Sequence, residues 1–435
     1  MKKSMMLFAA IALIFALLPI GADAAKLSDD TLAKKKEGWY VTGLPLVNFS
    51  SDDGFGYGVR AYLYFNGQKD DPYYDSTPYF MQLYAQYFAT TNGVQYHELN
   101  LDMPYIAGTK FRIKSAFVYD ADINANFFGL GADIAKSKLY NPGDPTIKYS
   151  KYSDYQDFID DNKKYYQFYK YSIVRPKYYL YLFRDMTDEI KLMAGAEFKY
   201  VTIDTYQGEK FKSTIQEPTL LDTTKAFVPG FDGGWTNYAR FGIGYDTRDF
   251  EPDPNKGIYL DYCFEAANST LGSEYDFLKN NVGANFFVNP IGKLVLALRL
   301  AYTTSSEDIP FYEMNWFGFS LNRREGLGGN RTLRGYKKNR FVGRTMTMGN
   351  AEFRWQFYEV TGGGQRFAFK VVGFCDTGNV YDGMGDPFSD PRFSDYHTSY
   401  GGGLVIAWNL ATIIHVYYGI SEEDTGLYVN FEHNF

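Results

Sequence analysis

A glycine-rich, basic stretch is the segment of this 435-residue chain best equipped for chemistry. It has the sequence GLGGNRTLRGYKKNRFVG, residues 326–343, between two strand-like patterns at 293–302 and 344–358. Its five cationic residues are Arg331, Arg334, Lys337, Lys338 and Arg340. The pattern predicts a long loop with Arg334 near its tip. Such a loop can be a solvated turn, a phosphate cradle, or a plug whose arginine is held by carboxylates.

Motifs for enzymatic chemistry are absent from the sequence. We find no GxSxG nucleophile elbow, no HExxH and no Cys/His metal spacing, and the four histidines are scattered. The glycines of 326–330 are followed by neither a helix nor a Lys-Ser/Thr pair, which argues against a P-loop. We therefore predict a protein that is not an enzyme and uses no metal or cofactor.

The N-terminus has the pattern of a secretory signal. Lys2 and Lys3 precede an apolar run at 7–18, and Ala22-Asp23-Ala24 forms a small-residue cleavage site. We expect a signal peptide at 1–24, a short polar periplasmic lead at 25–38, and a single β-barrel domain at 39–435. The net charge of −7 argues against a nucleic-acid partner.

Composition narrows the fold class to a membrane barrel. Aromatic residues make up 19% of the chain, with 40 Tyr and 37 Phe, while the mean hydropathy is only −0.34. Beyond the signal, no apolar run reaches the roughly 18 residues that a transmembrane helix needs. Aromatic girdles facing lipid and polar side chains facing a lumen account for this combination.

Sixteen strand-like segments, separated by turn residues, follow one another from Trp39 to the end of the chain. They lie at 39–49, 54–66, 77–90, 93–104, 109–123, 168–183, 188–205, 235–247, 256–269, 274–289, 292–304, 342–358, 364–378, 398–408, 411–420 and 425–435. We predict an all-β fold, a 16-stranded antiparallel transmembrane β-barrel, with a lumen-inserted loop between strands 11 and 12.

The alternation of side chains assigns the two faces of each strand. In 344–358 the even positions include Asn350, Glu352 and Arg354, whereas Phe353 and Trp355 are odd. A large soluble β-protein also alternates, so phase alone does not separate the two classes. The signal sequence, the aromatic excess, the even strand count and the asymmetric loops favour the membrane barrel.

Loop lengths give the barrel two different ends. The long polar connections 124–167, 206–234, 305–341 and 379–397 all follow odd-numbered strands and should face outward. The other end receives mostly short turns, with 66–77 as the exception.

The same phase places three charged residues together. Asp376 and Glu352 fall on the lumen faces of adjacent predicted strands, and a loop folded into the lumen brings Arg334 between them. An arginine removed from water needs carboxylates, and its planar fork suits bidentate partners. We predict that this triad pins the loop as a unit.

The two cysteines are predicted to remain unpaired. Cys263 falls on the lumen face and Cys375 on the lipid face, four strands apart. A disulfide needs a Cα spacing that this placement cannot provide.

The two end strands must pair to close the barrel. The first contains Gly43 and Pro45, and a proline cannot donate to a strand ladder. We therefore expect a weak seam between strands 1 and 16, or a proline placed at a non-bonded position. In the last strand, Phe431, His433 and Phe435 alternate outward.

Several segments resemble the BamA/TamA-type outer-membrane assembly barrels, the bacterial surface antigen family. LGGNRTLRGY (327–336) is similar to the family's lumen-loop signature, and 245–262, NAEFRW (350–355) and FCDTGNVYDG (374–383) resemble its turn and strand motifs. The matching loop residues are Gly328, Gly329, Arg331, Leu333, Gly335 and Tyr336, and the matching turn residues are Asp246, Arg248, Asp249 and Gly257. The terminal Phe435 resembles the signal by which outer-membrane barrels are recognised for insertion.

The resemblance implies a sixteen-stranded barrel in the bacterial outer membrane in which Arg334 bonds to Glu352 and Asp376. Its implied partners are outer-membrane lipid and unfolded outer-membrane proteins or a separate periplasmic partner. Family members carry POTRA domains before the barrel, and residues 25–38 are too few for one. We therefore expect a short member without them.

Three functions stay open at this point. The first is an assembly or translocation barrel, in which strands 1 and 16 part and a substrate strand pairs with the free edge. The second is a passive pore or transport channel controlled by the basic loop. The third is a binding or structural barrel whose Tyr- and Asp-rich connection at 134–167 contacts a partner.

Overall fold

The computed structural model describes residues 32, 35–206, 217–251, 253–362, 365–408, 412–431, 433 and 435. The predicted signal peptide at 1–24 lies outside the described residues, as does most of the predicted lead.

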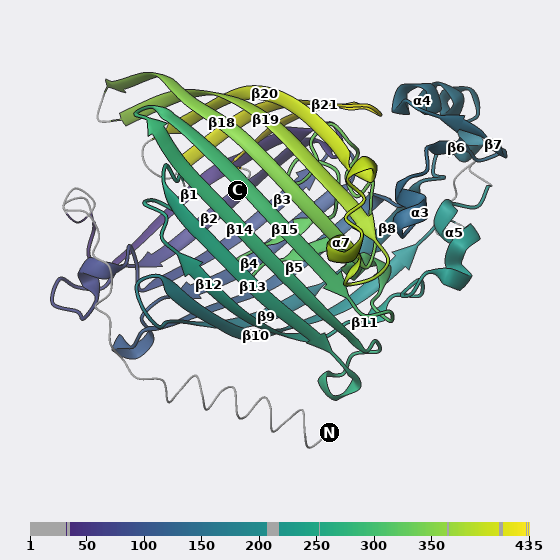
Figure 1. Ribbon diagram of the computed structural model, residues 1–435. Helices are drawn as coiled ribbons and strands as arrows, with labels where there is room; N and C mark the ends of the chain where they lie inside the picture. The colour runs from purple at the N-terminus through teal and green to yellow at the C-terminus, as the bar shows by residue number, and fades with distance from the viewer. Residues whose placement is uncertain are drawn as a thin grey trace.

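Antiparallel strands close into one barrel (Figure 1). They are β1 Trp39–Ser50, β2 Gly54–Phe65, β3 Met81–Thr90, β4 Val94–Met103, β5 Phe111–Asn126, β8 Lys170–Val174, β9 Lys177–Asp185, β10 Ile190–Asp204, β11 Gly234–Trp235, β12 Tyr238–Asp246, β13 Gly257–Ala267, β14 Phe277–Ile291, β15 Leu294–Ser305, β18 Thr345–Gly362, β19 Gln365–Tyr381, β20 His397–Trp408, β21 Thr412–Ser421 and β22 Thr425–Phe431. Because β8 and β9, and likewise β11 and β12, each make up one crossing, the described chain has the predicted sixteen crossings.

Local departures from the predicted boundaries have chemical causes. The sixth crossing breaks into β8 and β9 at Arg175-Pro176, where the proline has no N–H to donate. β3 begins four residues later than predicted, after Pro78, which has no N–H to donate to a strand ladder. β22 ends at Phe431, so the prediction of a strand to residue 435 is wrong.

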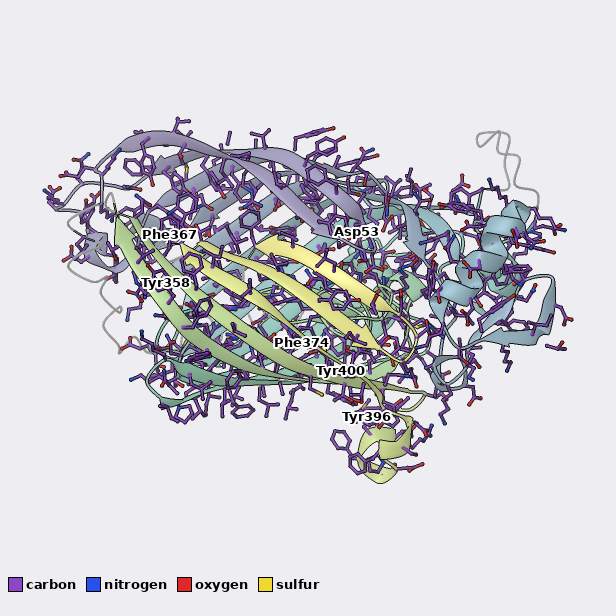
Figure 2. The ribbon with its side chains drawn as sticks, turned by 90° about the horizontal axis from the view of Figure 1, so that it is seen from above. Asp53, Tyr358, Phe367, Phe374, Tyr396 and Tyr400 are labelled. Atoms are coloured by element: carbon purple, nitrogen blue, oxygen red, sulfur yellow. The ribbon has the colours of Figure 1, made fainter. Side chains whose placement is uncertain are left out.

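Burial confirms the predicted faces of β18. Asn350, Glu352 and Arg354 are at most 3% exposed, whereas Phe353 and Trp355 are 44% and 48% exposed. Polar side chains therefore point inward and an apolar surface covers the outside, as a bilayer requires. In Figure 2, Tyr358 and Phe367 lie toward one end of this wall and Tyr400 toward the other.

Both cysteines are free, as predicted. Cys263 is buried on the lumen side of β13, and Cys375 is exposed on the outer face of β19. The Arg240 guanidinium donates to the Cys263 thiol at 3.5 Å.

The four long connections gather at one end of the barrel, which we call the loop end; the opposite end is the turn end (Figure 1). The connection from β5 to β8 contains α3 Ala132–Ala135, β6 Leu139–Asn141, β7 Asp144–Tyr149 and α4 Tyr152–Asp161, and that after β10 contains α5 Leu220–Thr224. An aromatic cluster joins these two connections into a cap. The connection from β19 to β20 contains α7 Asp386–Ser389. None of the helices within the described ranges is long and apolar enough to cross a membrane.

Residues 306–344, between β15 and β18, form the lumen loop. It contains α6 Phe311–Met314, β16 Trp316–Gly318 and β17 Arg323–Glu325. A buried core from the loop packs against the inner wall, with Phe317, Leu327, Leu333 and Tyr336 against Met346 and Val380. The loop therefore inserts into the barrel lumen, as the sequence predicted.

Candidate functional site

Arg334 lies completely buried at the centre of the lumen loop. Its Nε and Nη2 donate to the two carboxylate oxygens of Asp376, both at 2.7 Å, and its Nη1 donates to Glu352 Oε1 at 2.8 Å. Asp376 also accepts the backbone N–H of Arg334 at 3.1 Å. The ring of Phe374 packs 3.5 Å from the guanidinium carbon. The lumen loop thus brings Arg334 between the two carboxylates that strand phase placed on the lumen face.

Two further side chains complete this network. Asn350 donates to Asp376 Oδ1 at 2.8 Å and to the Thr332 carbonyl at 2.6 Å. Arg354 donates through Nε to the second oxygen of Glu352 at 2.9 Å. Each carboxylate therefore balances buried cations and holds a fixed orientation.

The glycines of the loop motif are required by backbone geometry. Gly335 has φ +100°, and a Cβ there would lie 2.9 Å from the backbone of Ile420 in β21. Gly328 has φ +119°, and a Cβ there would lie 2.0 Å from the Lys337 carbonyl oxygen. The loop tip is thus folded back on itself and pressed against the β21 wall, which only glycine permits.

A second ion network, which the sequence did not identify, fixes the first part of the lumen loop. Glu313 of α6 pairs with Arg323 at 2.9 Å and with Lys199 of β10. Lys199 also pairs with Glu197 at 3.1 Å, and all four side chains are largely buried. Glu197 and Lys199 are two residues apart in a strand-like segment and so share one face, which is the only signal for this network in the sequence.

The seam between β1 and β22 is short. β1 pairs with β2 over its whole length, but with β22 only at Phe49–Val429 and Ser50–Tyr428. Backbone and hydroxyl bonds between Ser51 and Leu427 extend the contact at the loop end. In the described chain, β1 from Trp39 to Asn48 has no strand on that side. The stretch with Gly43 and Pro45 is therefore a free edge.

The lumen loop contacts both sides of this seam. Lys337 pairs with Asp424 in the β21–β22 turn at 3.0 Å. The Lys338 N–H donates to Asp52 at 3.0 Å, and its ammonium lies 3.5 Å from Asp53, both in the β1–β2 turn. Burial alone would lower the pKa of Lys338, but the surrounding carboxylates raise it well above its usual value. Figure 2 labels Asp53 at this end of the barrel.

The chain end turns into the lumen after β22, which corrects the predicted outward alternation. His433 and Phe435 are only 5% and 9% exposed. Arg331 of the loop motif donates to the carbonyls of Phe431 at 3.2 Å and His433 at 2.9 Å. Arg354 donates to the Phe435 main-chain oxygen at 3.0 Å. Cations of the lumen thus hold the chain end away from the seam.

The turn motif lies at the turn end, between β12 and β13. Arg248 donates two bonds to Asp246, both at 2.8 Å, and stacks 4.5 Å from the Tyr259 ring. Asp249 accepts backbone N–H groups across the turn, and Gly257 has φ +111°. These are local bonds within the turn, and none of them involves a residue of the Arg334 network.

The contacts of this site therefore hold parts of the barrel in place. Buried ion pairs fix the lumen loop to the wall, partly exposed ion pairs join it to both sides of the seam, and hydrogen bonds from Arg331 join it to the chain end. Among the described residues, no group of three or more His, Cys, Asp or Glu could hold a metal ion.

Comparisons with known proteins place this geometry in context. The Omp85 superfamily domain matches residues 95–431, and a domain of unknown function (DUF5982) matches residues 19–80. A search of the curated proteins gave no match. The β1 side of the seam thus falls within the second match and the β22 side within the first.

Two solved structures have the same fold. BamA from Haemophilus ducreyi lacking POTRA domains 1–3 gives a TM-score of 0.54 at 11% identity, covering 92% of this chain and 71% of that one. CdiB from Escherichia coli gives a TM-score of 0.53 at 10% identity, covering 90% of this chain and 63% of that one. This chain therefore spans less than two thirds of the CdiB chain.

Proposed function

The chain belongs to the Omp85 superfamily, and from this premise we propose that it inserts or moves proteins, or lipids, at the bacterial outer membrane by opening the seam between β1 and β22. In this proposal the protein is exported by its signal sequence, is not an enzyme and needs no cofactor. Its partners are outer-membrane lipid and unfolded outer-membrane proteins, or a separate periplasmic protein.

The short seam carries the proposal. A barrel in lipid has to satisfy every backbone N–H and C=O, and each unsatisfied group there costs several kcal/mol. β1 leaves the edge from Trp39 to Asn48 without a strand, which is a template for β-augmentation. An incoming strand can pair with this edge while the rest of the wall stays closed.

The chain end is an alternative pairing partner for the free edge of β1. Continuing the observed register would place Phe431 opposite Val47, His433 opposite Pro45 and Phe435 opposite Gly43. Instead, Arg331 and Arg354 hold the end inside the lumen. The edge is therefore available to another strand, and return of the chain end would compete with that strand.

The lumen loop is the element that can couple these states. It touches the β1–β2 turn through Lys338 and the β21–β22 turn through Lys337, while Arg334 fixes it to β18 and β19. The β18–β19 wall thus acts as the fixed side, and the loop limits how far the seam opens.

A disulfide lock across the seam tests the proposal. Phe49→Cys and Val429→Cys would be combined in a Cys263→Ala/Cys375→Ala background, since these positions are paired and antiparallel pairs have a Cα spacing suited to a disulfide. The purified protein in lipid vesicles would receive a urea-unfolded eight-stranded barrel, and folding would be followed by gel mobility. We expect oxidation to block folding and reduction to restore it.

A matched control locks a continuous part of the wall. Phe286 and Leu298 are paired on β14 and β15, and their Cys pair should leave activity unchanged on oxidation. Equal activity of the oxidised and reduced seam variants would refute the proposal and leave a passive pore or a binding barrel.

A further inference from the structure

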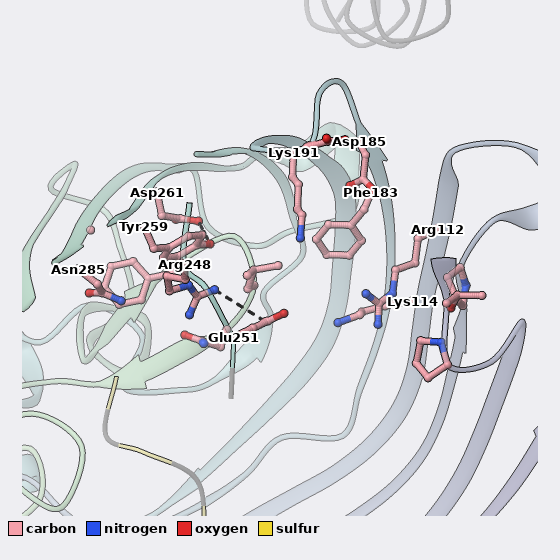
Figure 3. A pocket seen from close by; sticks show the side chains of 18 of the residues that line it. Arg112, Lys114, Phe183, Asp185, Lys191, Arg248, Glu251, Tyr259, Asp261 and Asn285 are labelled. Atoms are coloured by element: carbon pink, nitrogen blue, oxygen red, sulfur yellow. Dashed lines mark hydrogen bonds and ion pairs between the residues drawn. The ribbon is translucent and has the colours of Figure 1, made fainter. Parts of the chain in front are cut away.

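A cavity of about 900 Å³ opens at the turn end, and the seam proposal does not use it. Its walls come from β5, β9, β10 and the β12–β13 turn, and the lumen loop contributes Phe319, Leu321 and Arg324. No strand residue of β1 or β22 lines it. His433 and Phe435 of the enclosed chain end also line it, but no residue of the seam itself does, so a ligand can occupy the cavity while the seam is closed; Figure 3 shows part of it.

The cavity is lined by seven Lys and Arg side chains: Lys110, Arg112, Lys114, Lys191, Arg248, Arg299 and Arg324. Arg112 is neutralised by a two-bond pair with Asp102, and Arg248 by a two-bond pair with Asp246. Lys114 of β5 has no carboxylate partner in the described chain, and its ammonium lies 5.5 Å from the Phe183 ring centre.

Lys191 of β10 also lines the cavity, and within the described ranges it too has no ion-pair partner. Figure 3 shows its side chain extending into the hollow from the wall that also carries Phe183. Both lysines are half-buried. An uncompensated ammonium in such a recess attracts anions more strongly than a fully solvated one.

The carboxylates that line the cavity do not remove this excess. Asp261 is bonded to the Tyr259 hydroxyl at 2.7 Å and to the Ser320 N–H at 2.9 Å. Asp185 and Asp188 lie where β9 turns into β10, at the rim. Asp185 lies opposite Lys191 in the β9–β10 register but forms no ion pair with it in the described chain.

Glu251 is the exception, because it lies on a turn that reaches the cavity. Its side chain is 63% exposed and lies 4.0 Å from Arg248, a contact marked in Figure 3. Such a loosely held carboxylate is a replaceable counter-ion: it weakens the attraction for an incoming anion without filling the cavity.

We infer that this cavity binds a phosphate group attached to a partly apolar body, with Lys114 and Lys191 holding the phosphate. Ammonium groups act as compact charges suited to phosphate. The volume far exceeds that of phosphate alone, and Phe183, Phe319 and Leu321 offer apolar contact to the remainder. The same chemistry is found in a phospholipid headgroup and in a soluble organic phosphate. The inference does not rest on seam opening.

Binding to the purified full chain in detergent tests it, by calorimetry with three probes. The probes are inorganic phosphate, glycerol 3-phosphate, and a short-chain phosphatidic acid below its micelle concentration. Lys114→Gln/Lys191→Gln should lower affinity at least about tenfold. Glu251→Gln, on an exposed turn, should raise it several-fold and provides the readout if the double variant does not fold. Lys293→Gln, an exposed lysine at the same end, should leave it within about twofold.

The probes separate the two sources. Tight binding of the short-chain lipid alone identifies a lipid headgroup, and equal binding of glycerol 3-phosphate identifies a soluble phosphate. If no probe binds at millimolar concentration, or if neither the double lysine variant nor Glu251→Gln alters affinity, the inference is wrong. Seam-locked protein should bind as the parent does, so this result is independent of the proposed function.

Discussion

Lys337 and Lys338 are neighbours in the chain, yet they bind opposite sides of the barrel seam. Lys337 pairs with Asp424 beside β22 at 3.0 Å, and Lys338 reaches Asp53 beside β1 at 3.5 Å. One peptide unit thus spans the closure of the barrel at the loop end. This clasp is what distinguishes the lumen loop from a simple plug.

Breaking the clasp should widen the seam. Lys337→Gln/Lys338→Gln removes partly exposed ion pairs worth about 1 kcal/mol each. Spin labels at Phe49 and Val429 should show a broader and longer distance distribution in the double variant. Lys163→Gln, an exposed lysine in the cap, serves as the control and should leave the distribution unchanged. Identical distributions in the parent and double variant would show that the clasp does not hold the seam.

Removing Arg334 should cost more stability than any other single loop change. Arg334→Ala leaves Asp376 and Glu352 buried without their cation, a loss of about 3–5 kcal/mol. Arg334→Lys should be intermediate, since lysine cannot make the two-bond pair. Urea unfolding in detergent measures the loss of stability. Planar-bilayer conductance should show increased leak through Arg334→Ala.

An exposed ion pair provides the comparison for Arg334. Arg366→Ala removes an ion pair with Glu359 in which the two side chains are 41% and 36% exposed. The free energy of unfolding should therefore change by less than about 1 kcal/mol. Equal conductance of the parent and Arg334→Ala would count against the loop as a plug.

Gly335 should not tolerate a side chain. Gly335→Ala forces a residue with a Cβ into φ +100° against the Ile420 backbone, at a cost of about 1–3 kcal/mol. Gly362→Ala is the matched control, because a Cβ there meets nothing within 4 Å. Thermal unfolding should separate the two variants, and trypsin should cleave the loop faster in Gly335→Ala. Equal melting temperatures would mean that the loop tip is not pressed against β21.

The clasp should also respond to pH through Asp52. Burial raises the pKa of Asp52 to about 6, despite Lys337 and Lys338 nearby. A carboxyl group with a raised folded-state pKa contributes stability that is present at low pH and is lost as the pH rises through about 6. Asp52→Asn should therefore reduce the fall in melting temperature between about pH 4.5 and 7.5. Asp154→Asn, an exposed change in α4, should keep the parent's profile.

Sequence periodicity was sufficient to place Glu352 and Asp376 with Arg334. Both carboxylates lie within long strands, where a period of two fixes the face, and a buried arginine has few alternatives to them. The clasp could not be predicted in this way. Asp52 and Asp424 lie in turns, which have no period, and only closure of the barrel brings them near Lys338 and Lys337.

The chain end shows a different limit of periodicity. The alternation of Phe431, His433 and Phe435 continues without a break, yet β22 stops at the first of them. Pairing decides this outcome: the register would set His433 opposite Pro45, which has no N–H, while Arg331 and Arg354 offer donors inside the lumen. The local alternation of side chains carries no information about Pro45, Arg331 and Arg354, which are distant in the sequence.

The enclosed chain end has a consequence for how the protein itself is made. If the terminal aromatic is the address that a receptor reads, that address can be read only before the barrel closes, because Phe435 afterwards lies in the lumen with its main-chain oxygen bonded to Arg354. A finished molecule would then no longer compete with newly made chains for the receptor. Maturation would proceed in one direction, because the closed barrel encloses the residue that directed its insertion.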